Sequence, residues 1–282
     1  MGTTQTKGKE MSVQFKQAFK TSEFPLRQSL FWMNEGKLDS TWSWLSRNFV
    51  GKAEKMYGKL AEYGVNTMTF AVYCPSGHSP INPFKNNASP ADILNGAEVD
   101  DVEIERWRGL LSVGKLPHIN LVPTMFFGEQ HDIVKNKPFL NYFLPAVTQF
   151  ILPYSRAIIL VCEGEKGMNV HEMAYGINLI KGAMAFSDRK IPVGVHLQSN
   201  VFPQLLPSEA DFYAMEFPWH PIYEAENHSV EDGVREAKRV LACSPVPVLF
   251  IEDDAYCESP RARGLSRELA KLDGCYCLPG PL

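Results

Sequence analysis

Short apolar runs alternate with amphipathic stretches along most of the chain. The run "AIILV" at 157–161 is rich in β-branched residues and has the length of a buried strand. The stretch 169–186 carries apolar residues at spacings of three and four, which is typical of a helix. This alternation predicts βα units and a parallel sheet. The expected strands cover residues 29–33, 66–73, 119–127, 157–163, 191–197, 211–217, 245–253 and 275–279.

Each of these strands except the last is followed by a predicted helix or a long loop. The expected helices cover residues 41–63, 100–115, 140–155, 169–186, 229–243 and 259–272. Eight such units are the number in a (β/α)8 barrel. The alternative is an open doubly wound sheet, but neither G-x-G-x-x-G nor G-x-x-x-x-G-K-[ST] follows any strand. We therefore predict an α/β protein in which residues 26–282 form a single (β/α)8 TIM barrel domain, after a flexible leader at 1–25.

Composition narrows the function classes. The net charge of −4 comes without a basic stretch, which argues against nucleic-acid binding. No apolar run approaches the roughly 20 residues that span a bilayer, so no membrane partner is predicted. The first residues lack the apolar core of a signal peptide, which favours synthesis in the cytoplasm. Six cysteines are spread widely over the chain, and we expect reduced thiols. The sequence does not indicate an oligomeric state.

The predicted strand ends carry the candidate chemistry. In (β/α)8 barrels the active site lies at the carboxyl ends of the strands. Acids, aromatic rings and one histidine recur at these positions: Trp32, Tyr73, Glu163, Glu165, His196, Glu216, Trp219 and Glu252. Sugars offer hydroxyl groups to carboxylates and flat C–H faces to aromatic rings. Cleavage of a glycosidic bond needs one protonated acid and one ionised carboxylate, and it needs no cofactor or metal.

Glu163 and Glu165 stand two residues apart at the end of the fourth predicted strand. Because side chains alternate along a strand, both are expected to face the barrel interior. One of them could then raise the pKa of the other. In the alternative, one of them pairs with Lys166 or Arg156 and has only a structural role.

The segments "ILVCEGEKG" and "PVLFIEDD" resemble the fourth and seventh strands of clan A glycoside hydrolases, the "4/7" barrels. The resemblance implies a glutamate acid/base after strand four and a glutamate nucleophile, here Glu252, after strand seven. It also implies a carbohydrate substrate and retention of anomeric configuration. Members of the clan usually have Asn directly before the acid/base. Here Glu163 follows Cys162 and Glu165 follows Gly164, so both remain candidates. The sugar contacts expected around them are Trp32, Tyr73, His196, Glu216 and Trp219.

Two alternatives stay open beside a hydrolase of poly- or oligosaccharides. "PVGVHLQSN" and "ADFYAMEF" are similar to strands five and six of barrel proteins encoded by bacteriophages. This similarity suggests a carbohydrate-binding or structural barrel of a virion that has lost the chemistry. The second alternative is a metal-dependent barrel hydrolase. Its metal would be bound by histidines, although the H-E-x-x-H motif is missing. The histidines concerned are His78, His131, His196 and His220.

Overall fold

The structure is a computed structural model of the chain, and it describes only part of it. The described residues are 28–29, 67–73, 82–112, 120–198, 201–215, 229–250, 268, 272 and 275–277. The predicted leader at 1–25 lies outside them. So do four of the predicted site residues, which are Trp32, Glu216, Trp219 and Glu252.

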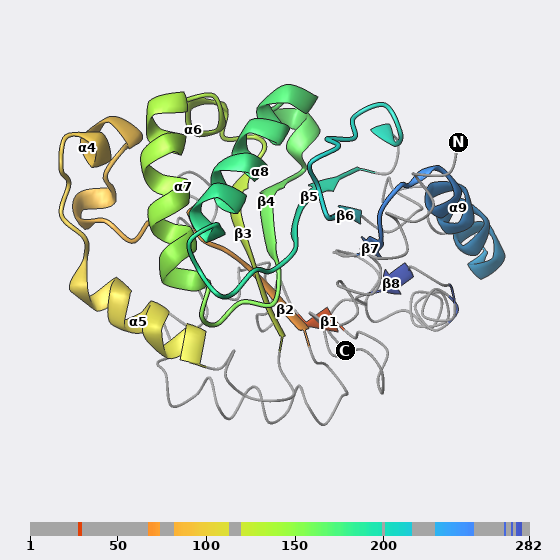
Figure 1. Ribbon diagram of the computed structural model, residues 1–282, viewed down its shortest axis with the longest axis horizontal. Coiled ribbons are helices and arrows are strands. Elements are labelled where there is room, and N and C mark those ends of the chain that lie inside the picture. Colours follow the sequence, from red (N-terminus) through yellow and green to blue (C-terminus); the bar gives the residue numbers. More distant parts are fainter. Residues whose placement is uncertain are drawn as a thin grey trace.

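Within the described residues the strands form one parallel sheet, ordered β1 to β8 as in the sequence. In the described part of the chain, helices follow β2, β3, β4 and β6 and lie around the sheet (Figure 1). This order confirms the predicted (β/α)8 TIM barrel, because a doubly wound sheet would reverse its strand order. The strands are β1 Gln28–Ser29, β2 Thr67–Ala71, β3 Asn120–Phe127, β4 Ile158–Cys162, β5 Val193–Leu197, β6 Phe212–Met215, β7 Val248–Phe250 and β8 Cys275–Cys277.

The helices begin at polar caps that the sequence supplies. The hydroxyl oxygen of Ser229 accepts a hydrogen bond from the backbone N–H of Asp232, and the backbone N–H of Ser229 donates one to the Asp232 carboxylate. The predicted start of α9 is therefore confirmed. Asn169 and Glu172 make the same capping box at α8. In the described part of the chain, no helix is both long and apolar enough to cross a membrane. The helices are η1 Lys85–Asn87, α4 Pro90–Leu94, α5 Asp101–Ser112, α6 His131–Val134, α7 Lys137–Ile151, η3 Gly164–Lys166, α8 Val170–Met184 and α9 Val230–Cys243.

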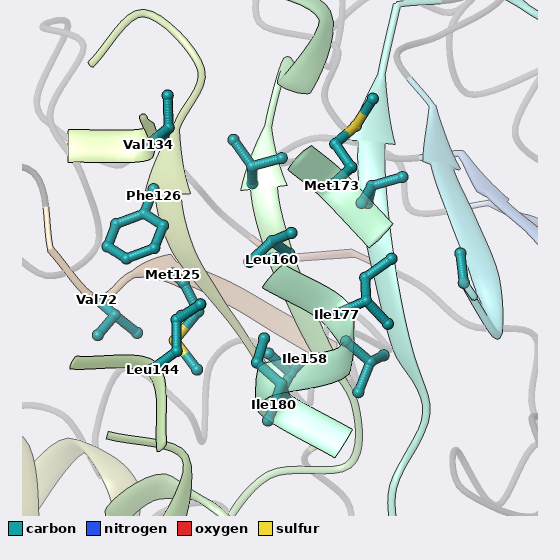
Figure 2. Packing of buried hydrophobic residues seen from close by; sticks show 14 of the residues in the cluster. Val72, Met125, Phe126, Val134, Leu144, Ile158, Leu160, Met173, Ile177 and Ile180 are labelled. Carbon is teal, nitrogen blue, oxygen red and sulfur yellow. The ribbon is translucent and has the colours of Figure 1, made fainter. Parts of the chain in front are cut away.

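The core between sheet and helices is built from apolar side chains of β4 and α8. Figure 2 shows Ile158 and Leu160 beside Ile177 and Ile180, and these side chains are fully buried. Gly176 lets the helix come close, because a Cβ atom there would lie 2.7 Å from Leu160 Cδ2. This packing fixes β4, and with it the turn that follows its carboxyl end.

Tyr73 lies in an aromatic cluster with Phe126, Phe139 and Phe143. Its ring centroid is 5.5 Å from that of Phe139 and 5.2 Å from that of Phe143. The side chain is fully buried, and its hydroxyl group donates a hydrogen bond to the carbonyl oxygen of Ala88. Burial raises the pKa of Tyr73 to about 12. The structure therefore places Tyr73 in the core rather than where a sugar could reach it, and we do not carry it into the proposed site.

The sequence predicted one long loop over residues 74–98, and its described part contains helical structure. Residues 90–94 form α4, whose cap is a capping box between Ser89 and Asp92. A five-residue helix is too short to show a 3.6-residue period, so only the cap and Pro90 marked it in the sequence.

Candidate functional site

The candidate site begins where β4 ends, one residue earlier than the sequence predicted. Glu163 has φ 48° and ψ 50°, which is the left-handed region, and Gly164–Lys166 forms a single 3₁₀ turn. A residue with a side chain costs roughly 1–2 kcal/mol in this conformation. Its backbone N–H donates to His196 Nδ1 at 3.0 Å, which helps to hold it there. The chain thus turns sharply at the carboxyl end of the strand.

Two glycines allow the turn to pack against the end of β3. The N–H of Gly128 donates to the carbonyl oxygen of Cys162 at 2.8 Å. A Cβ atom at Gly128 would lie 2.0 Å from the carbonyl oxygen of Glu163, and one at Gly167 would lie 1.9 Å from that of Gly128. Backbone therefore touches backbone on both sides of the turn, and this contact fixes the position of the glutamates.

Both carboxylate oxygens of Glu163 have partners. Oε2 lies 2.6 Å from Lys166 Nζ, and Oε1 accepts a hydrogen bond from Gln198 Nε2 at 3.1 Å. Burial alone would lower the pKa of Lys166. Its hydrogen bonds to Glu163 and Glu129 outweigh burial and raise the pKa above its usual value. A charged ammonium group at this distance favours the ionised form of Glu163.

Glu165 lies in a different environment. Oε1 accepts a long hydrogen bond, 3.4 Å, from the backbone N–H of Gln198. Oε2 is buried and has no hydrogen-bond partner among the residues that the structure describes. Burial raises the pKa of Glu165 above its ordinary value, and the negative charge of Glu163 adds to this shift. The two glutamates thus differ in environment, and burial shifts Glu165 toward the neutral acid.

Strand alternation was the reason for expecting both glutamates to face the barrel interior, and that reason does not apply here. Neither residue belongs to β4, because the strand ends at Cys162. Both carboxylates instead reach Gln198, just beyond β5. The predicted electrostatic effect of one glutamate on the other agrees with the raised pKa of Glu165. The alternative pairing with Lys166 also holds, but for Glu163 only.

His196 is fully buried on β5, so it cannot contact a sugar from this position. Its Nδ1 atom lies 3.0 Å from Cys162 Sγ and accepts the N–H of Glu163. Burial lowers the pKa of His196 to about 4, so the ring is neutral near pH 7. We assign it a structural role at the turn, in place of the predicted substrate contact.

The structure adds two residues that the predicted site did not include. Lys166 was considered in the sequence only as a structural partner, and Gln198 is the residue directly after the fifth predicted strand. The available signal for Lys166 was its position three residues after Glu163 in a tight turn. Nothing in the sequence indicated that Gln198 bridges the two glutamates, because that contact depends on the alignment of β4 with β5.

The described residues contain no group of three or more His, Cys, Asp and Glu side chains placed to hold a metal ion. His131 begins α6 and is exposed, whereas His196 is buried beside the turn. His78 and His220 lie outside the described residues. The metal-dependent alternative is therefore addressed by experiment below.

No protein-family model matches the chain, and no curated protein matches it. Solved structures do resemble it. An endo-1,4-β-mannanase from Rhizomucor miehei is 10% identical with a TM-score of 0.59, over 91% of this chain and 85% of that chain. A β-glucosidase from Exiguobacterium marinum is 12% identical with a TM-score of 0.51, over 91% and 87%.

A third similar structure is a β-glucuronidase from Ruminococcus gnavus, 12% identical with a TM-score of 0.50. The match covers 82% of this chain and only 40% of the β-glucuronidase chain. At such identities the likeness shows the fold alone. It agrees with the barrel described above.

Proposed function

We propose that this chain is a glycoside hydrolase that cleaves a poly- or oligosaccharide with two carboxyl groups, Glu165 and Glu252. The observation that carries the proposal is the contrast at the end of β4. Glu163 is paired with Lys166, while Glu165 is half-buried and its pKa is raised. A carboxyl group with a raised pKa is typical of the general acid in such reactions. The barrel fold, which the chain shares with structures of glycoside hydrolases, supports the proposal.

In this proposal Glu165 is the proton donor. A glycosidic oxygen leaves only if it receives a proton as the bond to the anomeric carbon breaks. An acid with a raised pKa keeps its proton closer to neutral pH than an ordinary glutamate does. Glu163 is the weaker candidate, because Lys166 and Gln198 occupy both of its oxygens.

Glu252 would be the nucleophile. It lies outside the described residues, two positions after β7. Strand β7 pairs in parallel with β6, and β6 pairs in parallel with β5. The carboxyl ends of β4 and β7 therefore belong to the same end of the barrel. An attacking carboxylate there would form a glycosyl-enzyme intermediate, which water then cleaves with Glu165 acting as the base.

The proposed ligand is a carbohydrate. Trp32, Glu216 and Trp219 remain the predicted sugar contacts, and they lie outside the described residues. The similar structures carry names that refer to mannan, glucosides and glucuronides. These names support the class of substrate but do not select one sugar. No cofactor is proposed, because two carboxyl groups suffice for this reaction.

The experiment is a screen of the wild-type protein against nitrophenyl glycosides and polysaccharides, with products followed by proton NMR. We expect turnover of at least one substrate, with retained anomeric configuration in the first product. Inversion would contradict the role of Glu252 as nucleophile. Binding without turnover across the panel would favour the carbohydrate-binding or virion barrel. Turnover that a chelator abolishes and a metal restores would favour the metal-dependent alternative.

A further inference from the structure

Lys166 has no direct part in the proposed reaction, yet its ammonium group contacts Glu163. We propose that Lys166 is a positioning residue that holds Glu163 as an ionised anchor, so that the Glu163–Lys166 pair sets the charge that acts on Glu165. This inference rests on the proposed function for its consequence in catalysis. Its physical content, the opposing charges of Glu163 and Lys166 acting on Glu165, can be measured without turnover.

The ammonium group of Lys166 contacts two carboxylates. Lys166 Nζ lies 2.6 Å from Glu163 Oε2 and 3.1 Å from Glu129 Oε1. The Lys166 side chain is 33% exposed and that of Glu163 is 18% exposed. Lys166 therefore joins the turn after β4 to the loop after β3, and its contact with Glu163 is partly shielded from water. Such pairs are screened less than pairs on an open surface.

Gln198 links Glu163 to Glu165. Gln198 contacts both, with its side chain on Glu163 Oε1 and its backbone N–H toward Glu165 Oε1. His196 fixes the Glu163 backbone by accepting its N–H. If the Glu163 side chain moved, it would thus disturb Gln198, which also contacts Glu165. The ammonium group at the other oxygen opposes this shift.

Charges of opposite sign act on Glu165. Among the described residues, the ionised groups near it are Glu163 and Lys166 on its own turn, and Glu129 reaches the cluster through Lys166. His196 on β5 is neutral near pH 7. Glu163 raises the pKa of Glu165 and Lys166 lowers it. Removing the charge of Lys166 should therefore raise the pKa of Glu165, and removing the charge of Glu163 should lower it. When both charges are removed, the two shifts should largely cancel. The predicted acids Glu216 and Glu252 are unchanged in all the variants used below.

The experiment is a carboxyl NMR titration of protein labelled with ¹³C-glutamate, in which the Glu165 signal is the one absent from Glu165→Gln. We expect a higher Glu165 pKa in Lys166→Met and a lower one in Glu163→Gln. The double variant should return close to the wild type. Lys166→Arg, which keeps the charge, should also resemble the wild type. Where Lys166→Met fails to fold by circular dichroism, Lys166→Gln carries the same expectation.

Equal Glu165 titration in wild type, Lys166→Met and Glu163→Gln would overturn the inference, and so would shifts of the same sign. These outcomes are independent of the substrate screen. Opposite shifts without any turnover would uphold the charge balance and remove only the proposed function. Where turnover is found, the basic limb of the pH–rate profile should move with the Glu165 pKa in each variant.

Discussion

Glu165→Gln is expected to lower kcat/KM on polysaccharides and alkyl glycosides by about 10²–10⁴-fold, the usual contribution of a general acid. The amide cannot deliver a proton to a poor leaving group. The dinitrophenolate of a dinitrophenyl glycoside leaves without that proton, so kcat/KM for this substrate should fall far less. Steady-state kinetics on a leaving-group series would measure this contrast. Added azide, which attacks the glycosyl-enzyme without a base, should restore part of the turnover and give a glycosyl azide.

The matched control is Glu98→Gln. Glu98 makes a surface pair with Lys85, and its side chain is 76% exposed, so the same change of charge there should leave kinetics unaltered. A loss in Glu165→Gln that is equal for all leaving groups and insensitive to azide would contradict a proton-donor role. It would instead indicate a general disturbance of the site.

Stability provides a second control on the same variant. Because burial raises the pKa of Glu165, the folded protein binds more protons than the unfolded chain between the two pKa values. The wild type therefore loses stability as pH rises through that window, whereas glutamine has nothing to ionise. The unfolding free energy of Glu165→Gln minus that of the wild type should increase from about pH 4.3, the ordinary pKa of glutamate, and then level off. Urea denaturation at several pH values checks the slope. A difference that decreases with pH would contradict the raised pKa.

Gly128→Ala is expected to destabilise the fold by about 3 kcal/mol or more, at the upper end of overpacking effects. Its methyl group would lie 2.0 Å from the carbonyl oxygen of Glu163, and backbone cannot rotate away as a flexible side chain can. The turn after β4 would have to move. Activity should therefore fall even where the protein remains folded. Urea denaturation measures the first effect, and kcat at saturating substrate measures the second.

Gly182→Ala is the matched control for this substitution. Gly182 lies exposed on α8, and a Cβ atom there would meet nothing within 4 Å. Alanine should stabilise the helix by about 0.5–1 kcal/mol. If Gly128→Ala were as harmless as Gly182→Ala, the close backbone contact between β3 and the turn after β4 would be wrong.

The fold was predictable from the sequence because it follows from periodicity. The apolar runs at 119–127 and 157–163 match β3 and β4 to within one residue at each end. The polar cap at Ser229 located the start of α9. Periodicity gives less at short elements, and α4 was missed for that reason.

The site was predictable only in part. The sequence indicated that acids stand at the end of the fourth strand, but it could not rank Glu163 against Glu165. That ranking depends on Lys166 and Gln198, and their contacts arise from the left-handed turn and from the alignment of two strands. Tyr73 and His196 were predicted as sugar contacts because they fall near strand ends. Both side chains are fully buried, so neither can contact a sugar, and periodicity does not reveal burial at such positions.

The central claim is that Glu165 and Glu252 face one another across the end of the barrel. A crystal structure of Glu165→Gln with a bound oligosaccharide would measure the separation of these two side-chain groups directly. The account predicts roughly 5–5.5 Å, the separation in retaining glycosidases, with the glycosidic oxygen beside residue 165. A separation beyond about 9.5 Å, the upper end for inverting enzymes, or a Glu252 side chain turned away from the sugar, would contradict it.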